Sequence, residues 1–192
     1  MKFLIIDDDP DFRSLIIRNL QNEFSSAEFA GFAGQREFEE AIRRWDFDVV
    51  ITDMDNPGLD GLHVCRQIRE RDAYLPVIML TASGNEELAV EGMKSGLSDY
   101  VTKRHLLRLP VAVWDCIEKA RIRKAYDLTK TRQATQFILT EILAGSASLQ
   151  ATAPKILQAI CEGFGWALGE LWRVDPESKR AYLAVPGRAV SP

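Results

Sequence analysis

Short, continuous apolar segments recur along the first half of the chain, and each is followed by a turn or by a segment with helical spacing. An apolar run without alternation is typical of a strand that is buried on both faces of a sheet. We therefore expect strands at residues 3–6, 27–32, 48–52, 76–81 and 98–102, the second of them weak.

The segments between these runs place apolar residues three and four positions apart, which is helical periodicity. Asp9-Pro10 is a typical start for the first helix, and Asp60-Gly61 precedes the third. Helices are expected at 10–20, 35–45, 61–69 and 86–94, with another from about 106. Regular alternation of strand and helix predicts the α/β class, with a five-stranded, parallel, doubly wound sheet.

Reactive polar residues stand where four of these strands end. Asp7 and Asp8 follow the first strand, and Asp53 follows the third. Thr81 ends the fourth strand, and Lys103 follows the fifth. Because the carboxyl ends of parallel strands share one edge of the sheet, we expect these side chains to meet in one pocket.

Three carboxylates and a lysine in one pocket suit a hard divalent cation and a phosphoryl group. Mg²⁺ takes oxygen ligands and keeps several waters of its own. A strand-end aspartate beside Mg²⁺ can attack a phosphoryl group, so we predict Asp53 as a phosphate acceptor. Lys103 and the Thr81 hydroxyl would hold phosphoryl oxygens, and the backbone carbonyl of Asp55 would complete the metal shell.

Composition argues against several other classes of protein: nucleic-acid-binding, cysteine-metal, membrane and secreted proteins. A formal net charge of -4 gives no basic footprint for nucleic acid. The three cysteines are scattered and fit no metal spacing. No apolar run approaches the roughly 18 residues of a membrane span, and the N-terminal run is too short for a signal peptide. These features predict a cytoplasmic chain without a membrane segment.

Four motifs in order closely resemble the receiver domain of two-component response regulators. They are Ile6-Asp7-Asp8, Asp53 followed by Asn56-Pro57-Gly58-Leu59-Asp60-Gly61, Thr81-Ala82, and Asp99-Tyr100-Val101-Thr102-Lys103. The resemblance covers residues 1 to about 120 and implies a flavodoxin-like fold. It also implies that a histidine kinase or a phosphotransfer protein donates the phosphoryl group.

The same resemblance implies a role for each pocket residue. Asp8 and Asp53 would ligate Mg²⁺ directly, and Asp7 would act mainly through water. Lys103 would pair with the phosphoryl group, while Thr81 and Tyr100 would form a switch that moves on phosphorylation. Receivers usually have proline after the lysine, whereas this chain has Arg104, for which we expect a trans peptide bond.

Two other functions fit parts of the sequence. Asp53-Met54-Asp55 also resembles the nucleophile motif of haloacid-dehalogenase-type phosphatases, although the other acidic pair lies upstream rather than downstream. A receiver can alternatively serve as a phosphorylation-independent platform for interaction or dimerisation. As an enzyme, the chain would at most phosphorylate itself from small phosphodonors and dephosphorylate itself.

The last third of the chain is predicted to start with a long helix, from about 106 to 143. Ala153-Pro154 then predicts the start of another helix, and residues 169–174 and 181–185 predict a hairpin of two strands. We divide the chain into a receiver at 1–120, a signalling-helix linker at 121–134 and a partial GAF-like segment at 135–192. The GAF resemblance rests on Ile160-Cys161-Glu162, Gly165-Trp166 and Glu170-Leu171-Trp172-Arg173-Val174. This α+β segment is shorter than a whole GAF domain, so a longer protein and a homodimer through the helix are expected.

Overall fold

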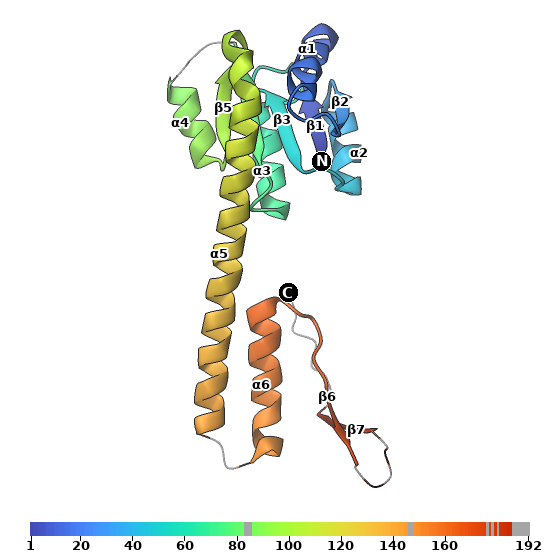
Figure 1. Cartoon of the computed structure of the whole chain (residues 1–192), viewed down its shortest axis with the longest axis vertical. Coiled ribbons are helices and arrows are strands. Elements are labelled where there is room, and N and C mark those ends of the chain that lie inside the picture. The colour runs from blue at the N-terminus through green and yellow to red at the C-terminus, as the bar shows by residue number, and fades with distance from the viewer. Residues whose placement is uncertain (83–85, 146–147, 176, 178, 180, 186–192) are drawn as a thin grey trace. The chain divides into compact units, whose positions relative to one another are not determined.

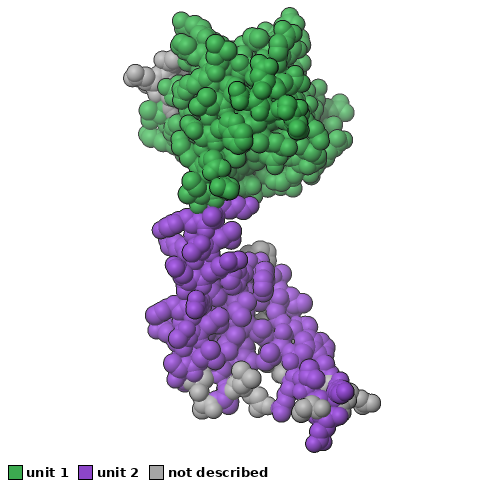
Figure 2. Space-filling model, in the orientation of Figure 1, with its two compact units in different colours: residues 1–123 green, residues 124–192 purple. Residues whose placement is uncertain are grey.

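The structure, a computed structural model, describes the whole chain except residues 83–85, 146–147, 176, 178, 180 and 186–192. The chain divides into two compact units, residues 1–123 and residues 124–192 (Figure 2). Within the described residues, no helix is both long enough and apolar enough to cross a membrane.

The first unit is built on a five-stranded sheet in the order β2-β1-β3-β4-β5, with every neighbouring pair parallel (Figure 1). Its strands are β1 (Lys2–Ile6), β2 (Glu28–Phe32), β3 (Val49–Asp53), β4 (Val77–Thr81) and β5 (Asp99–Thr102). Its helices are α1 (Pro10–Gln21), α2 (Gln35–Arg44), α3 (Gly61–Arg71), α4 (Glu86–Lys94), the 3₁₀ helix η1 (Lys103–Arg108) and the first part of α5 (Leu109–Ala144). The predicted α/β class and parallel sheet are confirmed.

Two separate cores hold the sheet, because successive strand residues point to opposite faces. On β1, Phe3 and Ile5 pack with α1 and α5, whereas Leu4 and Ile6 pack with α2 and α3. The strands β3 and β4 divide their side chains in the same way. Burial on both faces explains why these strands read as unbroken apolar runs in the sequence.

Two element boundaries differ from the prediction. The third strand extends to Asp53, so the acidic residue is the last residue of β3 rather than the first of the turn. The chain after β5 does not enter an α-helix directly but first forms η1, and α5 begins at Leu109. The prediction of one long helix to about residue 143 is confirmed, because α5 continues without a break to Ala144.

The second unit contains the rest of α5, the helix α6 (Leu149–Phe164) and a hairpin of β6 (Leu171–Val174) and β7 (Ala181–Val185). The predicted start of α6 at Ala153-Pro154 is wrong. Ser148 caps the helix by accepting a hydrogen bond from the Ala151 amide, so Pro154 lies inside it. Helix and antiparallel hairpin are present as expected, while membership of the GAF family stays a prediction.

Candidate functional site

Three carboxylates meet at the carboxyl edge of the sheet. Asp7 and Asp8 follow β1, and Asp53 ends the neighbouring strand β3. One oxygen of each of these side chains lies within 4.8 Å of the other two. Asp7 and Asp53 are buried, whereas Asp8 is exposed to solvent. The topology of the sheet therefore builds an acidic pocket, closed at its base and open on the side of Asp8.

Lys103 connects the two buried carboxylates. Its Nζ lies 2.9 Å from Asp7 Oδ2 and 2.9 Å from Asp53 Oδ2. Because η1 starts at Lys103, the 3₁₀ turn fixes the lysine at the end of β5. One lysine cannot neutralise three carboxylates, so three negative charges and one positive charge leave a formal charge of two negative units in the pocket.

Burial shapes the ionisation of this cluster. It raises the pKa of the Asp7 carboxyl, against the hydrogen bonds from Lys103 and from the Asp9 amide, which favour the charged form. Burial also opposes the charge of Lys103, but its hydrogen bonds to Asp7 and Asp53 outweigh this, and the pKa of the lysine is raised. Lys103 therefore stays protonated as the pocket's permanent cation.

One oxygen of the pocket has no partner within the described part of the chain. Asp53 Oδ2 accepts from Lys103, but Asp53 Oδ1 is buried and has no hydrogen-bond partner. A buried, unsatisfied carboxylate oxygen is costly, and native structures usually supply a ligand for it. The all-oxygen donor set, the unpartnered Oδ1 and the residual negative charge together fit a hard divalent cation such as Mg²⁺.

The other residues selected from the sequence lie on β4, on β5 and in the turn after β3, and they differ in burial. Thr81 is buried at the end of β4, and its strand neighbour β3 ends on Asp53. Tyr100 lies on β5, is partly buried and packs against the core on the α2 and α3 side. Asp55 is exposed in the turn after β3. The peptide bond between Lys103 and Arg104 is trans, as expected from the missing proline.

Two neighbours of the pocket were not identified from the sequence. Phe12 on α1 places its ring centroid 4.5 Å from Lys103 Nζ, a distance at which the ring face attracts a cation. Arg13 donates to the backbone carbonyl of Asp7. Phe12 reads as an ordinary apolar position of an amphipathic helix, and nothing in the sequence indicates that its ring contacts a lysine more than 90 positions away.

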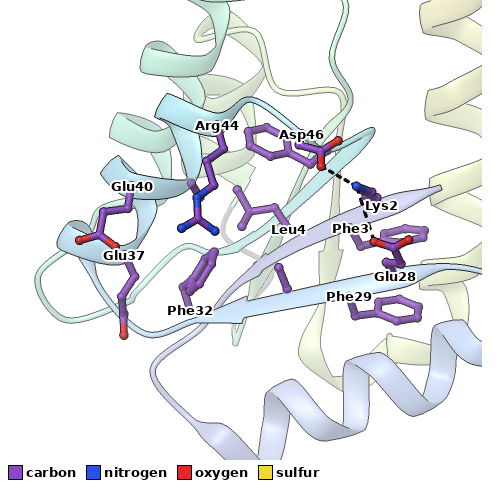
Figure 3. Close-up of a pocket in the computed structure, with 13 residues that line it drawn as sticks. Lys2, Phe3, Leu4, Glu28, Phe29, Phe32, Glu37, Glu40, Arg44 and Asp46 are labelled. Atoms are coloured by element: carbon purple, nitrogen blue, oxygen red, sulfur yellow. Dashed lines mark hydrogen bonds and ion pairs between the residues drawn. The ribbon is translucent and has the colours of Figure 1, made fainter.

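A second hollow, of about 300 Å³, lies between β1, β2 and α2 (Figure 3). Lys2 stands at its rim and bonds both Asp46 and Glu28, so that the cation is already paired. The hollow contains none of the strand-end residues of the acidic pocket. We therefore assign the chemistry of the chain to the acidic pocket.

Comparison with known sequences places residues 3–111 in one protein family. The family described as the response regulator receiver domain matches residues 3–111. ResD of Bacillus subtilis, a transcriptional regulatory protein, is 38% identical over 105 residues, which are 53% of this chain and 41% of ResD. TcrA of Mycobacterium tuberculosis is 33% identical over 103 residues, or 54% of this chain and 40% of TcrA. The chain thus spans about two fifths of the length of these relatives.

Solved structures agree with the sequence comparison. The receiver domain of the Francisella response regulator 1452 is 28% identical, with a TM-score of 0.55 over 62% of this chain and 97% of that one. A response regulator receiver domain protein from Clostridium thermocellum is 29% identical, with a TM-score of 0.53 over 63% and 97%. Through residues 3–111, the chain belongs to the response regulator receiver domain family of two-component signalling.

Proposed function

We propose that the chain is a phosphoacceptor module that takes a phosphoryl group on Asp53 from a histidine kinase or a phosphotransfer protein. In the transfer, a carboxylate oxygen of Asp53 forms a bond to phosphorus as the phosphorus–nitrogen bond of the donor's phosphohistidine breaks. The leaving nitrogen keeps the electron pair. The observation that carries the proposal is the unpartnered, buried Asp53 Oδ1 beside a carboxylate pair and a lysine.

Asp8, Asp53 and the backbone carbonyl of Asp55 would hold Mg²⁺, with Asp7 acting through water. When bound, the ion would neutralise the carboxylates and the charge of the phosphoryl oxygens. Lys103 is already 2.9 Å from Asp53 Oδ2, so its ammonium can move from the carboxylate to a phosphoryl oxygen with little displacement. Thr81, at the end of the next strand, would donate its hydroxyl to another oxygen.

The proposal predicts that phosphorylation from a small donor depends on Mg²⁺. Incubation of the chain with acetyl phosphate and Mg²⁺ should add one phosphoryl group, seen in the mass of the intact chain. Chelation of the metal should reduce the addition by at least about a hundredfold, since several kcal/mol of charge stabilisation are lost. If the chain took up no phosphoryl group and bound no Mg²⁺, an interaction platform independent of phosphorylation would be the better account.

Transmission of the signal is proposed to run through Thr81 and Tyr100 and then along α5 to a C-terminal output. A GAF-like segment would follow α5, and two copies of the chain would pair through the α5 helix. In support, α5 exposes large apolar side chains beyond the first unit, including Tyr126, Leu128, Phe137 and Ile138. Thr135 lies on the same part of α5 but is buried, so it would not contact a second copy of the chain.

The pairing of two copies is tested by the mass of the particle in solution. Light scattering at high protein concentration should give twice the chain mass of 21.6 kDa. Replacing Tyr126 and Phe137 by serine should shift the mass toward one chain, because both side chains are exposed and would lose apolar contact area. A single-chain mass for the unaltered protein, with and without a phosphoryl analogue, would contradict pairing through α5.

A further inference from the structure

A hollow of about 500 Å³ lies in the first unit between the ends of α3 and α4 and the face of α5. Four of its lining residues are cations: Arg69, Lys94, Lys119 and Arg123. Among the described residues that line it, none is a carboxylate. We refer to it as the basic hollow. Four cations around one concavity that no carboxylate lines are unusual on a chain with a formal net charge of -4.

The base of the basic hollow is formed by Arg69, which is about half buried. Its guanidinium donates to three backbone carbonyls, those of Gly96, Asp72 and Leu75, and to the Ser98 hydroxyl. All of these acceptors are neutral. Hydrogen bonds of this kind orient the side chain without neutralising its charge. Burial lowers the pKa of Arg69, and the nearby Asp72 carboxylate, which favours the charged form, does not offset this effect.

The backbone of the loop after α4 is adapted to this arginine. Gly96 has a φ of +92°, and a Cβ at this position would lie 2.9 Å from Arg69 Cγ. A residue with a side chain would therefore be strained and would displace the arginine. The loop and the arginine form one rigid base, so the position of the charge is fixed by the fold.

A second guanidinium lies close to the first. Arg123 on α5 is near enough to lower the pKa of Arg69, an effect that adds to the larger one of burial. The Arg123 guanidinium also lies 6.0 Å from the centre of the Tyr74 ring, which lines the hollow as well. Two like charges held together at a concave surface repel, and an anion between them would remove both the repulsion and the cost of burial.

Two carboxylates near the basic hollow have hydrogen-bond or ion-pair partners other than its four cations. Asp72 Oδ1 accepts hydrogen bonds from the amides of Tyr74 and Leu75, where it ends α3. Glu118 lies 3.4 Å from Arg121, one position from the lining residues on α5. Within the described residues, neither of these two carboxylates forms an ion pair with Lys119 or Arg123.

The basic hollow is separate from the acidic pocket. Leu97 and Ser98 immediately precede β5, and Ala73 and Tyr74 closely precede β4, so the hollow lies at the amino ends of these strands. Asp53, Thr81 and Lys103 lie at the opposite, carboxyl edge of the same parallel sheet. A ligand in the basic hollow would therefore not compete directly with a phosphoryl group at Asp53.

We propose that the basic hollow binds a small anion that carries a diphosphate group. Four cations around one concavity match the charge of a diphosphate. A guanidinium such as that of Arg123 can bind two phosphate oxygens side by side, whereas Arg69 already donates four of its five N–H groups and can donate one more. A volume of about 500 Å³ lies in the range of pockets for small molecules, whereas an acidic protein surface would need a much larger interface. Tyr74 offers a ring face for an organic part, such as the base of a nucleotide.

The proposal is tested by calorimetric titration of the full chain with inorganic pyrophosphate and, separately, with ADP. EDTA is present throughout, so that no metal can bring phosphate to the acidic pocket. Saturable binding of one anion per chain is expected. Binding of ADP tighter than that of pyrophosphate would identify a nucleotide as the ligand class, and equal binding would identify the free diphosphate.

Paired substitutions on α5 decide whether the basic hollow is the site. Lys119→Ala with Arg123→Ala should weaken binding at least about tenfold, because two charged hydrogen-bond donors are lost. Arg121→Ala with Lys124→Ala removes the same charge from exposed positions on the same helix and should change affinity by less than about twofold. Absence of saturable binding, or an equal loss in both double variants, would overturn the proposal.

Discussion

Replacement of Lys103 by alanine is expected to lower the free energy of unfolding by about 3 kcal/mol in the absence of Mg²⁺. The lysine is the shared partner of Asp7 Oδ2 and Asp53 Oδ2, and both carboxylates are buried. Without it, two buried negative charges would face each other and the exposed Asp8 with no cation between them. Urea denaturation at neutral pH, with and without metal, measures the change.

The same variant gives a test of the metal site that does not depend on phosphorylation. In the proposed function Mg²⁺ would bind the folded pocket and not the unfolded chain, so it should recover part of the lost stability. Mg²⁺ should raise the free energy of unfolding more in Lys103→Ala than in the unaltered chain, because Lys103 no longer competes with the metal for the carboxylates. Arg104→Ala removes an exposed cation next in sequence and should leave stability within about 0.5 kcal/mol. A loss in Lys103→Ala no greater than in this control would contradict the account of the pocket.

Replacement of Gly163 by alanine is expected to destabilise the second unit by about 2 kcal/mol. Alanine normally favours a helix over glycine, but here the added Cβ would lie 2.1 Å from Thr135 Oγ1 and 3.3 Å from Thr135 Cβ. Thr135 on α5 is buried, so it has little room to move. Gly163 thus permits the close approach of α5 and α6. Thermal unfolding and hydrogen exchange of the α6 amides measure the loss.

A second substitution separates this clash from other effects of alanine. In a Thr135→Ala background, the Oγ1 atom is absent, and Gly163→Ala should cost less than about 1 kcal/mol. Gly145→Ala is the matched control, since its Cβ would meet no atom nearer than 3.6 Å. The packing argument is wrong if Gly163→Ala is as stable as the control, or if the Thr135→Ala background gives no recovery.

The sheet and the acidic pocket were predictable because each depends on short stretches of the sequence, the apolar runs and the residues that directly follow them. Phe3 to Ile6 and Val49 to Ile51 are buried on both faces, which produces an unbroken apolar run in the sequence. Parallel pairing then brings Asp7, Asp8 and Asp53 to one edge without further information, because all strands end on the same side. The roles of these residues in phosphoryl transfer stay predictions.

Features that depend on long-range packing were not predictable. The contact between Phe12 and Lys103 joins α1 to η1, and the basic hollow gathers residues from α3, α4 and α5 whose charges look like ordinary solvated positions in the sequence. The start of α6 was misjudged because Pro154 resembled a first helical residue, while the Ser148 cap stands next to the loop. Such features require the tertiary structure.

The identity of the acceptor is the central claim, and comparison of two neighbouring carboxylates tests it most directly. The intact mass of the unaltered chain, Asp53→Asn and Asp55→Asn is measured after incubation with acetyl phosphate and Mg²⁺. Asp53 is buried beside Lys103, whereas Asp55, two residues away, is exposed. The account predicts one added phosphoryl group in the unaltered chain and in Asp55→Asn, and none in Asp53→Asn. Full phosphorylation of Asp53→Asn would contradict it.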